Sequence, residues 1–229
     1  PVEEINKTQD GLEIIYKEKE KRVTIKTKNI FFSNPLLEFI KIFNTEIPEE
    51  VYKEANKLDY RNHISVHLTI DKKLFDDNWI YVHSPELKLA RISDFTNFSE
   101  LMSANNEFPL TLEYFCFEND EIWNSSNQEI INFALTELKD IFRVEFNILH
   151  SEVSRNAKAY PVIQTGFENS INIIKSWLKT QSEITAIGRS GMFKYNNQDH
   201  AMATGIYAAR NYLGIGKYDP WEVNVDGEY

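Results

Sequence analysis

Residues 188–200 hold the densest group of features suited to binding a ligand. The segment reads GRSGMFKYNNQDH, and the flanking patterns predict that it joins a short strand to the last helix. Gly188 and Gly191 let the backbone approach a ligand closely or adopt positive φ. Arg189 offers a planar guanidinium that can bind a phosphate through two hydrogen bonds. A helix that begins near Gln198 would present free N–H groups to an anionic or electron-rich atom.

The same segment also has a purely structural interpretation. An Asn or Asp would cap the helix, and the remaining polar side chains would form a solvated surface turn. Spacing alone favours this interpretation, because capped helices and polar loops are common in proteins.

Arg91 and Tyr160 are the other candidate binding residues. A lone arginine on a strand of an acidic protein usually forms a surface ion pair that contributes little to stability. Tyr160 precedes Pro161, so it reads structurally as a buried tyrosine with a hydrogen-bonded hydroxyl before a proline that ends a strand. The functional interpretation presents that hydroxyl to a ligand.

The sequence contains no strong motif for a metal site or for a catalytic nucleophile. His63 and His67 are four residues apart, but their segment alternates like a strand, on which both would share a face. His83 follows in the next strand, with no acidic residue in a convincing ligand position. Cys116 is the only cysteine, which excludes a disulfide within the chain and a cysteine metal cluster. We therefore expect no metal, and the sequence names no catalytic residue.

Composition excludes some classes of partner. The 229 residues carry 25 basic and 35 acidic side chains, a net charge of −10, which argues against general binding to nucleic acid or to a membrane surface. No apolar run approaches the roughly 20 residues needed to span a bilayer. With one cysteine, a cytoplasmic setting is the simplest expectation.

Strands gather in the middle of the chain and helices flank them, which predicts the α+β class. We expect a mixed, mostly antiparallel sheet of about six strands flanked by helices, with 61–70, 78–83, 88–94 and 110–117 among its strands. The clearest helix is predicted from Ser126 to about Phe142. The first 44 residues and the last 45 or so are expected to belong to a domain different from the middle of the chain.

A dinucleotide-binding fingerprint is missing from the sequence. No G-x-G-x-x-G follows a predicted strand. The nearest match, Gly214-Ile215-Gly216, comes after a helix, and Asp219 stands where the third glycine would be.

The segment GRSGMFKYNNQDHAMATGIYAARNYL resembles the C-terminal flavin-contacting motif of UDP-galactopyranose mutases. It resembles more closely the amine-oxidase-like or protoporphyrinogen-oxidase-like FAD-dependent oxidoreductases. Three earlier segments resemble upstream parts of these proteins in the same order. They are NIFFSNPLLEFIKIF, WIYVHSPELKLARISDFTNFS and AYPVIQTGFENSINIIKSWL. The resemblance covers nearly all of the chain.

This resemblance implies a role for each candidate residue. The residues that would line the flavin are Gly188, Arg189, Asn197, Gln198, Asp199 and His200. Arg91 matches an arginine that grips a substrate pyrophosphate, Arg189 would reach the same region, and Tyr160 would lie in the substrate cleft. The implied domains are 1–44 and 184–229 as parts of the FAD domain, with 45–183 as the substrate domain.

The resemblance implies the C-terminal portion of an FAD-dependent enzyme that acts on a nucleotide sugar. Its N-terminal FAD-binding half would be absent, so we expect this chain alone to bind FAD weakly and to be inactive. One alternative is a flavin oxidoreductase acting on an amine or another small organic substrate; another is a non-catalytic binding domain. A phosphate-gripping Arg91 favours the nucleotide sugar, and an aromatic cage favours the small organic substrate.

Overall fold

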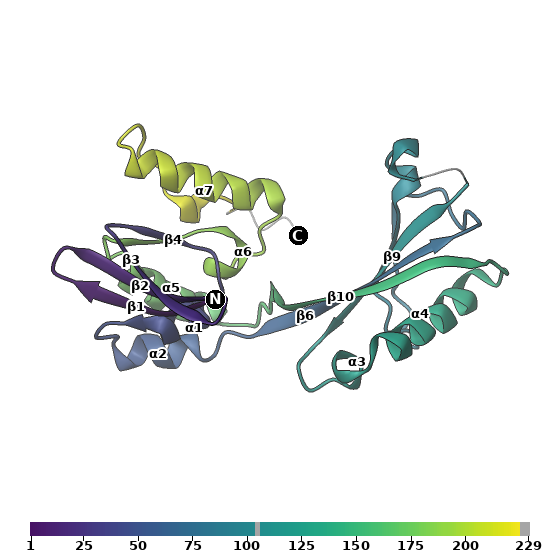
Figure 1. Cartoon of the computed structure of the whole chain (residues 1–229), viewed down its shortest axis with the longest axis horizontal. Helices are drawn as coiled ribbons and strands as arrows, with labels where there is room; N and C mark the ends of the chain where they lie inside the picture. Colours follow the sequence, from purple (N-terminus) through teal and green to yellow (C-terminus); the bar gives the residue numbers. More distant parts are fainter. Residues whose placement is uncertain (104–105, 225–229) are drawn as a thin grey trace. The chain divides into compact units, whose positions relative to one another are not determined.

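The computed structural model describes residues 1–103 and 106–224, and the chain divides into two compact units (Figure 1). Unit 1 combines residues 1–60 with 160–229, and unit 2 comprises residues 61–159. The chain enters unit 2 along β6 (Tyr60–Ile70) and leaves it along β10 (Ile148–Pro161).

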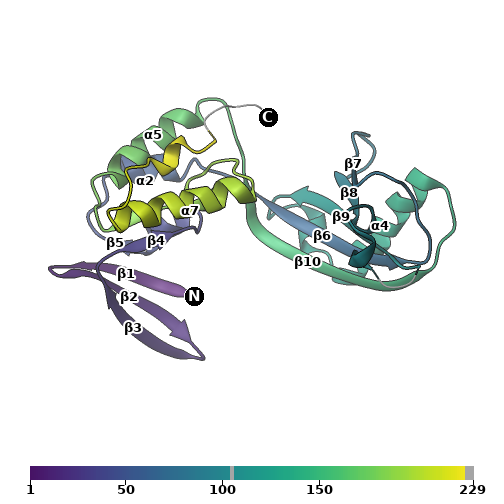
Figure 2. The same cartoon turned by 90° about the horizontal axis from the view of Figure 1, so that it is seen from above.

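Unit 1 contains two sheets with helices packed against them. The strands are β1 (Val2–Thr8), β2 (Gly11–Glu18), β3 (Lys21–Thr27), β4 (Ile30–Phe32), β5 (Phe43–Asn44) and β11 (Ile184–Ala186). β1, β2 and β3 form an antiparallel meander, and β5 pairs parallel to β1 (Figure 2). β4 and β11 form a separate two-stranded parallel sheet.

The helices of unit 1 lie around one core, in which the first three bury their apolar faces. They are α1 (Leu36–Ile42), α2 (Glu49–Ala55), α5 (Phe167–Leu178), α6 (Gly188–Gly191), α7 (Gln198–Tyr212) and the 3₁₀ turn η3 (Pro220–Glu222). α1 begins after Pro35, a residue whose fixed φ suits a helix start, and it buries Phe39 and Ile40. Phe39 stacks on Phe32 of β4 with ring centroids 3.7 Å apart. This core therefore fixes the position of β4.

Unit 2 is a five-stranded sheet with its core on one face. The order is β10-β6-β9-β8-β7, and the strands not yet defined are β7 (Trp79–Tyr81), β8 (Arg91–Asp94) and β9 (Phe108–Cys116). The β7–β8, β8–β9 and β6–β9 pairs are antiparallel. Alternate residues of β6 and β9 pack with α4 (Asn127–Phe142), whose start is fixed by a capping box between Ser126 and Glu129.

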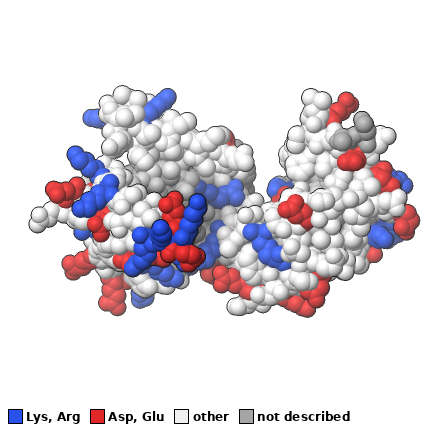
Figure 3. Space-filling model, viewed as in Figure 1, with Lys and Arg blue, Asp and Glu red and all other residues white. Residues whose placement is uncertain are grey.

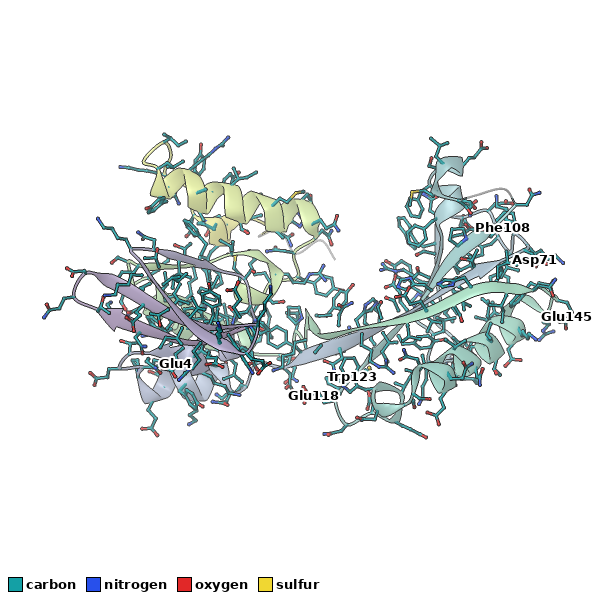
Figure 4. All side chains as sticks on the ribbon, in the orientation of Figure 1. Glu4, Asp71, Phe108, Glu118, Trp123 and Glu145 are labelled. Atoms are coloured by element: carbon teal, nitrogen blue, oxygen red, sulfur yellow. The ribbon has the colours of Figure 1, made fainter. Side chains whose placement is uncertain are left out.

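Short turns complete unit 2. They are η1 (Phe95–Asn97), η2 (Glu100–Met102) and α3 (Glu121–Asn124). Asp71 lies just after β6 (Figure 4). It accepts hydrogen bonds from the backbone N–H and the side-chain amide of Asn147, at 2.8 and 2.6 Å. This pair joins the chain that leaves β6 to the chain that enters β10.

The α+β class is confirmed, and the predicted helix at 126–142 is observed at 127–142. The compact units differ in extent from the predicted ranges 1–44, 45–183 and 184–229: α2 and α5 both pack in the core of unit 1. The assignment of these parts to flavin and to substrate stays a prediction. Within 1–103 and 106–224, none of the helices has the length and apolar character needed to cross a bilayer.

Candidate functional site

Arg189 is the centre of a polar cluster in unit 1. Its Cζ lies 4.6 Å from the ring centroid of Tyr160 and 5.2 Å from that of Tyr195, so the guanidinium packs over both rings. Its Nε donates to the carbonyl oxygen of Asn196 at 2.6 Å. In the described part of the chain its two terminal nitrogens have no hydrogen-bond partner. The guanidinium is therefore oriented by its neighbours while its outer donors stay available to a ligand.

Gly188 connects β11 to this cluster in a conformation that favours glycine. Its φ is +73°, and a Cβ added there would have Cβ of Ser33 as its nearest neighbour, at 3.7 Å. Its N–H donates to Oγ1 of Thr204 at 2.8 Å, and that hydroxyl donates to the carbonyl oxygen of Ala201 at 2.7 Å. Thr204 is fully buried. One hydroxyl thus ties the segment before Arg189 to helix α7.

Thr204→Val is expected to lower the free energy of unfolding by about 2 kcal/mol, because it leaves the buried N–H of Gly188 without an acceptor. Thr204→Ser keeps the hydroxyl and should recover most of that loss. Urea denaturation of both variants measures the difference. Equal stability of the two variants would show that this hydrogen bond contributes nothing.

The start of α7 is a capped helix end. Asn197 and His200 form a capping box in which the N–H of Asn197 donates to Nδ1 of His200 at 3.2 Å. The structural interpretation of these two residues is thus observed, and both are already engaged in the cap. Gln198 and Asp199 are exposed in the first turn. Oδ2 of Asp199 lies 3.8 Å from Nε2 of His200, so Gln198 is the predicted flavin-lining residue here whose side chain is neither in the cap nor beside a charged partner within the described residues.

The loop before α7 is hydrogen-bonded to the chain near residues 221–224. Nζ of Lys194 donates to the carbonyl oxygens of Trp221, at 2.8 Å, and of Val223. Burial and the nearby charge of Lys175 lower the pKa of Lys194. Asn196 is 1% exposed, and its side-chain nitrogen has no hydrogen-bond partner among the described residues. A buried amide donor of this kind is a feature that a ligand atom would satisfy.

Arg91 lies in unit 2 and is bound to a carboxylate. Its Nε and Nη2 donate to Oε1 and Oε2 of Glu113 at 2.9 and 2.7 Å. Nε2 of His63 also donates to Oε2 of Glu113, at 3.1 Å. Burial raises the pKa of Glu113, but the hydrogen bonds from His63 and Arg91 outweigh it, so this pKa lies below its ordinary value. The charge of Arg91 is therefore largely neutralised by Glu113.

Glu113→Gln is expected to destabilise the protein by about 2 kcal/mol at neutral pH, because it removes the carboxylate charge that pairs with Arg91. A carboxyl with a lowered pKa stabilises the fold above its unfolded-state pKa and loses that contribution as pH falls through its folded-state value. Wild-type stability should thus fall below about pH 4, and the variant should lose less there. Thermal unfolding between pH 3 and 7 tests this, and parallel curves would contradict it.

His67 is also held on the helix-free face of the sheet. It shares a face with His63, as the strand pattern predicts, and its ring nitrogens lie 3.0 Å from Oγ1 of Thr111 and 3.1 Å from Oγ of Ser154. No group of three His, Cys, Asp or Glu side chains within the described ranges has the arrangement of a metal site. The histidines are instead hydrogen-bonded parts of a polar sheet face.

The structure thus brings Tyr160, Gly188 and Arg189 together in unit 1 with the start of α7, and it places Arg91 in unit 2. Sequence reasoning missed Tyr195, Thr204 and Glu113. Glu113 carried a signal, since it is a lone acid in the apolar strand LTLEYFCF.

Comparison with known proteins shows a likeness of fold. No family model and no curated protein matches the sequence. A reduced UDP-galactopyranose mutase superposes with a TM-score of 0.80 at 18% identity, over 98% of this chain and 49% of that chain. A protein from Exiguobacterium sp. 255-15 assigned as a protoporphyrinogen oxidase gives 0.65 at 14% identity, over 83% and 41%. An oxidoreductase from Methanosarcina mazei gives 0.50 at 12%, over 68% and 36%.

At these identities the comparisons establish the fold, and the predicted resemblance in fold is confirmed. The chain spans about half the length, or less, of each of these solved structures.

Proposed function

We propose that this chain is the substrate-side, flavin-contacting part of an FAD-dependent enzyme that acts on a nucleotide sugar. The observation that carries the proposal is Arg189, a stacked guanidinium whose terminal nitrogens have no partner within the described residues. A planar donor held in this way suits a phosphate, which accepts two parallel hydrogen bonds. The fold shared with a UDP-galactopyranose mutase supports the same class of substrate.

The residues of unit 1 fit one edge of a flavin. Gly188 has no side chain and a positive φ, the buried side-chain nitrogen of Asn196 lacks a partner among the described residues, and Gln198 begins a helix. These groups offer close backbone approach and N–H donors to a ring with electron-rich atoms. The residues that would lie against the flavin are Gly188, Arg189, Asn197, Gln198, Asp199 and His200. Asn197 and His200 would do so as members of the capping box. FAD, when bound, supplies the redox or nucleophilic chemistry.

The same residues do not supply a cradle for the FAD pyrophosphate. Such a cradle needs a glycine-rich turn between a strand and a helix, and the sequence contains none. We therefore propose that a nucleotide-binding half outside these 229 residues completes the cofactor site.

Mixing the purified chain with FAD and removing free cofactor by gel filtration tests the incomplete site. We expect less than stoichiometric retention of the flavin absorbance. Tight one-to-one retention by residues 1–229 alone would overturn the proposal that another half is needed.

An oxidoreductase acting on a small organic substrate is the second candidate. Two observations favour it: Glu113 neutralises Arg91, and Tyr160 and Tyr195 place two aromatic rings 5.7 Å apart beside Arg189. Calorimetric titration of the flavin-loaded protein with UDP separates the two. Binding of UDP that depends on Arg189 supports the nucleotide sugar, and no binding supports the second candidate.

A further inference from the structure

Unit 2 contains a groove on the face of its sheet that carries α4. The groove consists of two adjoining hollows of about 330 and 320 Å³, a size that suits a small ligand. Lys88, Glu121 and Ile122 line both hollows, so these residues stand where the two meet. We call the pair of hollows the α3–α4 groove, because α3 and the first half of α4 supply much of its lining.

Tyr114 lines one end of the groove and carries a buried hydroxyl. The residue is 1% exposed, and its hydroxyl has no hydrogen-bond partner among the described residues. Burial and the nearby charge of Glu137 raise the pKa of Tyr114, so the hydroxyl keeps its proton. A buried hydroxyl without a partner costs free energy, which a ligand oxygen that accepts its hydrogen bond would recover.

The junction of the two hollows offers one positive and one negative charge. The backbone of Lys88 is fixed, because its N–H donates to Oε1 of Glu137 at 2.6 Å. Its ammonium lies 6.0 Å from the ring centroid of Phe133, and no carboxylate of the described chain pairs with it. The carboxylate of Glu121 likewise has no hydrogen bond or ion pair within the described ranges. Both charged groups are therefore available to a ligand.

The other end of the groove is apolar. Ile130 and Phe133 of α4 line it together with Ile122. Acidic side chains gather along the edge of unit 2 that carries α3 (Figure 3). A purely anionic ligand would be repelled by these acids, and a purely cationic ligand would be repelled by Lys88. The charges of the groove thus favour a ligand that carries both signs.

We propose that the α3–α4 groove binds a free α-amino acid with an apolar side chain. The carboxylate of the amino acid pairs with Lys88 and accepts from the hydroxyl of Tyr114, while its ammonium pairs with Glu121. Its side chain packs on Ile130 and Phe133. All of these residues belong to unit 2, so the inference is independent of the flavin site proposed for unit 1.

Calorimetric titration of the purified chain with L-leucine tests the site. Isocaproate is the same molecule without its amine, and isoamylamine lacks the carboxylate. We expect L-leucine to bind with a Kd of about 1 mM or lower, and each analogue to bind about tenfold more weakly or worse, because each loses a charge-assisted contact. Absence of binding by both L-leucine and L-phenylalanine would overturn the proposal. Equal binding of L-leucine and either analogue would overturn it too, because one charge would then suffice.

Variants identify the residues that bind. Tyr114→Phe should weaken L-leucine binding about fivefold without lowering the melting temperature, because the hydroxyl has no partner in the free chain. Lys88→Gln and Glu121→Gln should each weaken binding about tenfold or more. Glu118→Gln is the matched control, since Glu118 is exposed and does not line the groove (Figure 4). Equal loss in the control, or a less stable Tyr114→Phe that binds L-leucine normally, would contradict the assignment.

Discussion

Gly191→Ala is expected to lower the free energy of unfolding by about 3 kcal/mol. Gly191 ends α6 and lies against the chain that leaves β4. An added Cβ would come within 2.8 Å of the carbonyl oxygen of Phe32 and 3.0 Å of Cα of Ser33. Both contacts are with backbone, which cannot rotate away, so α6 and β4 would have to separate. Urea denaturation followed by circular dichroism measures the change.

Gly205→Ala is the matched control for this prediction. Gly205 lies inside α7, and an added Cβ there would meet no atom within 4 Å. Alanine in an open helix position should stabilise the protein by about 1 kcal/mol. The two substitutions add the same methyl group and should act with opposite sign. A loss of similar size in both would refute close packing as the cause.

The glycines of the 188–200 segment show which backbone features can be predicted from the sequence and which cannot. The pattern predicts that Gly188 and Gly191 let the backbone approach a ligand closely or adopt positive φ. In the structure Gly188 is buried and has positive φ, with Cβ of Ser33 3.7 Å from an added Cβ, whereas the backbone of β4 fills the space beside Gly191. A strand near the start of the chain makes that contact, and such a long-range pairing leaves no local signal.

Helix positions were predictable and their packing partners were not. α4 and α7 have clear apolar spacing or caps, and both are found close to their predicted bounds. α2 and α5 each bury an apolar face, yet their pattern does not tell which core they face, and both pack in unit 1 instead of the predicted middle domain. β1 was missed, because VEEINKT carries few apolar residues and only Ile5 is buried.

Arg91 is a charged residue whose packing partner could likewise not be predicted from the sequence. The sequence offered an ion pair or a pyrophosphate grip as its role, and the structure provides the ion-pair partner, Glu113, which lies 22 residues away on the neighbouring strand. That pairing depends on strand register, which the alternation of apolar residues fixes only after the neighbouring strand is known. Removing Arg91 should therefore affect the stability of unit 2 more than ligand affinity.

Arg189→Ala in the intact flavin-loaded enzyme, of which we propose this chain to be a part, is expected to lower kcat/KM by about tenfold to a hundredfold. The loss corresponds to one charge-assisted hydrogen bond to a phosphate, which contributes about 1.5–3 kcal/mol. Arg189→Lys keeps the charge but loses the planar face that packs over Tyr160 and Tyr195, so it should recover only part of the activity. Steady-state kinetics with the flavin absorbance spectrum of each variant provides the measurement.

Arg91→Ala is the contrasting variant, because Arg91 already has Glu113 as its partner. It should unfold at lower urea concentration and retain most of its kcat/KM once folded. If instead Arg91→Ala loses activity about a hundredfold while Arg189→Ala keeps normal turnover and an unaltered flavin spectrum, the anion grip belongs to unit 2. The stacked guanidinium of unit 1 would then be a structural element that orders the loop between β11 and α7, since its hydrogen bond to Asn196 spans that loop.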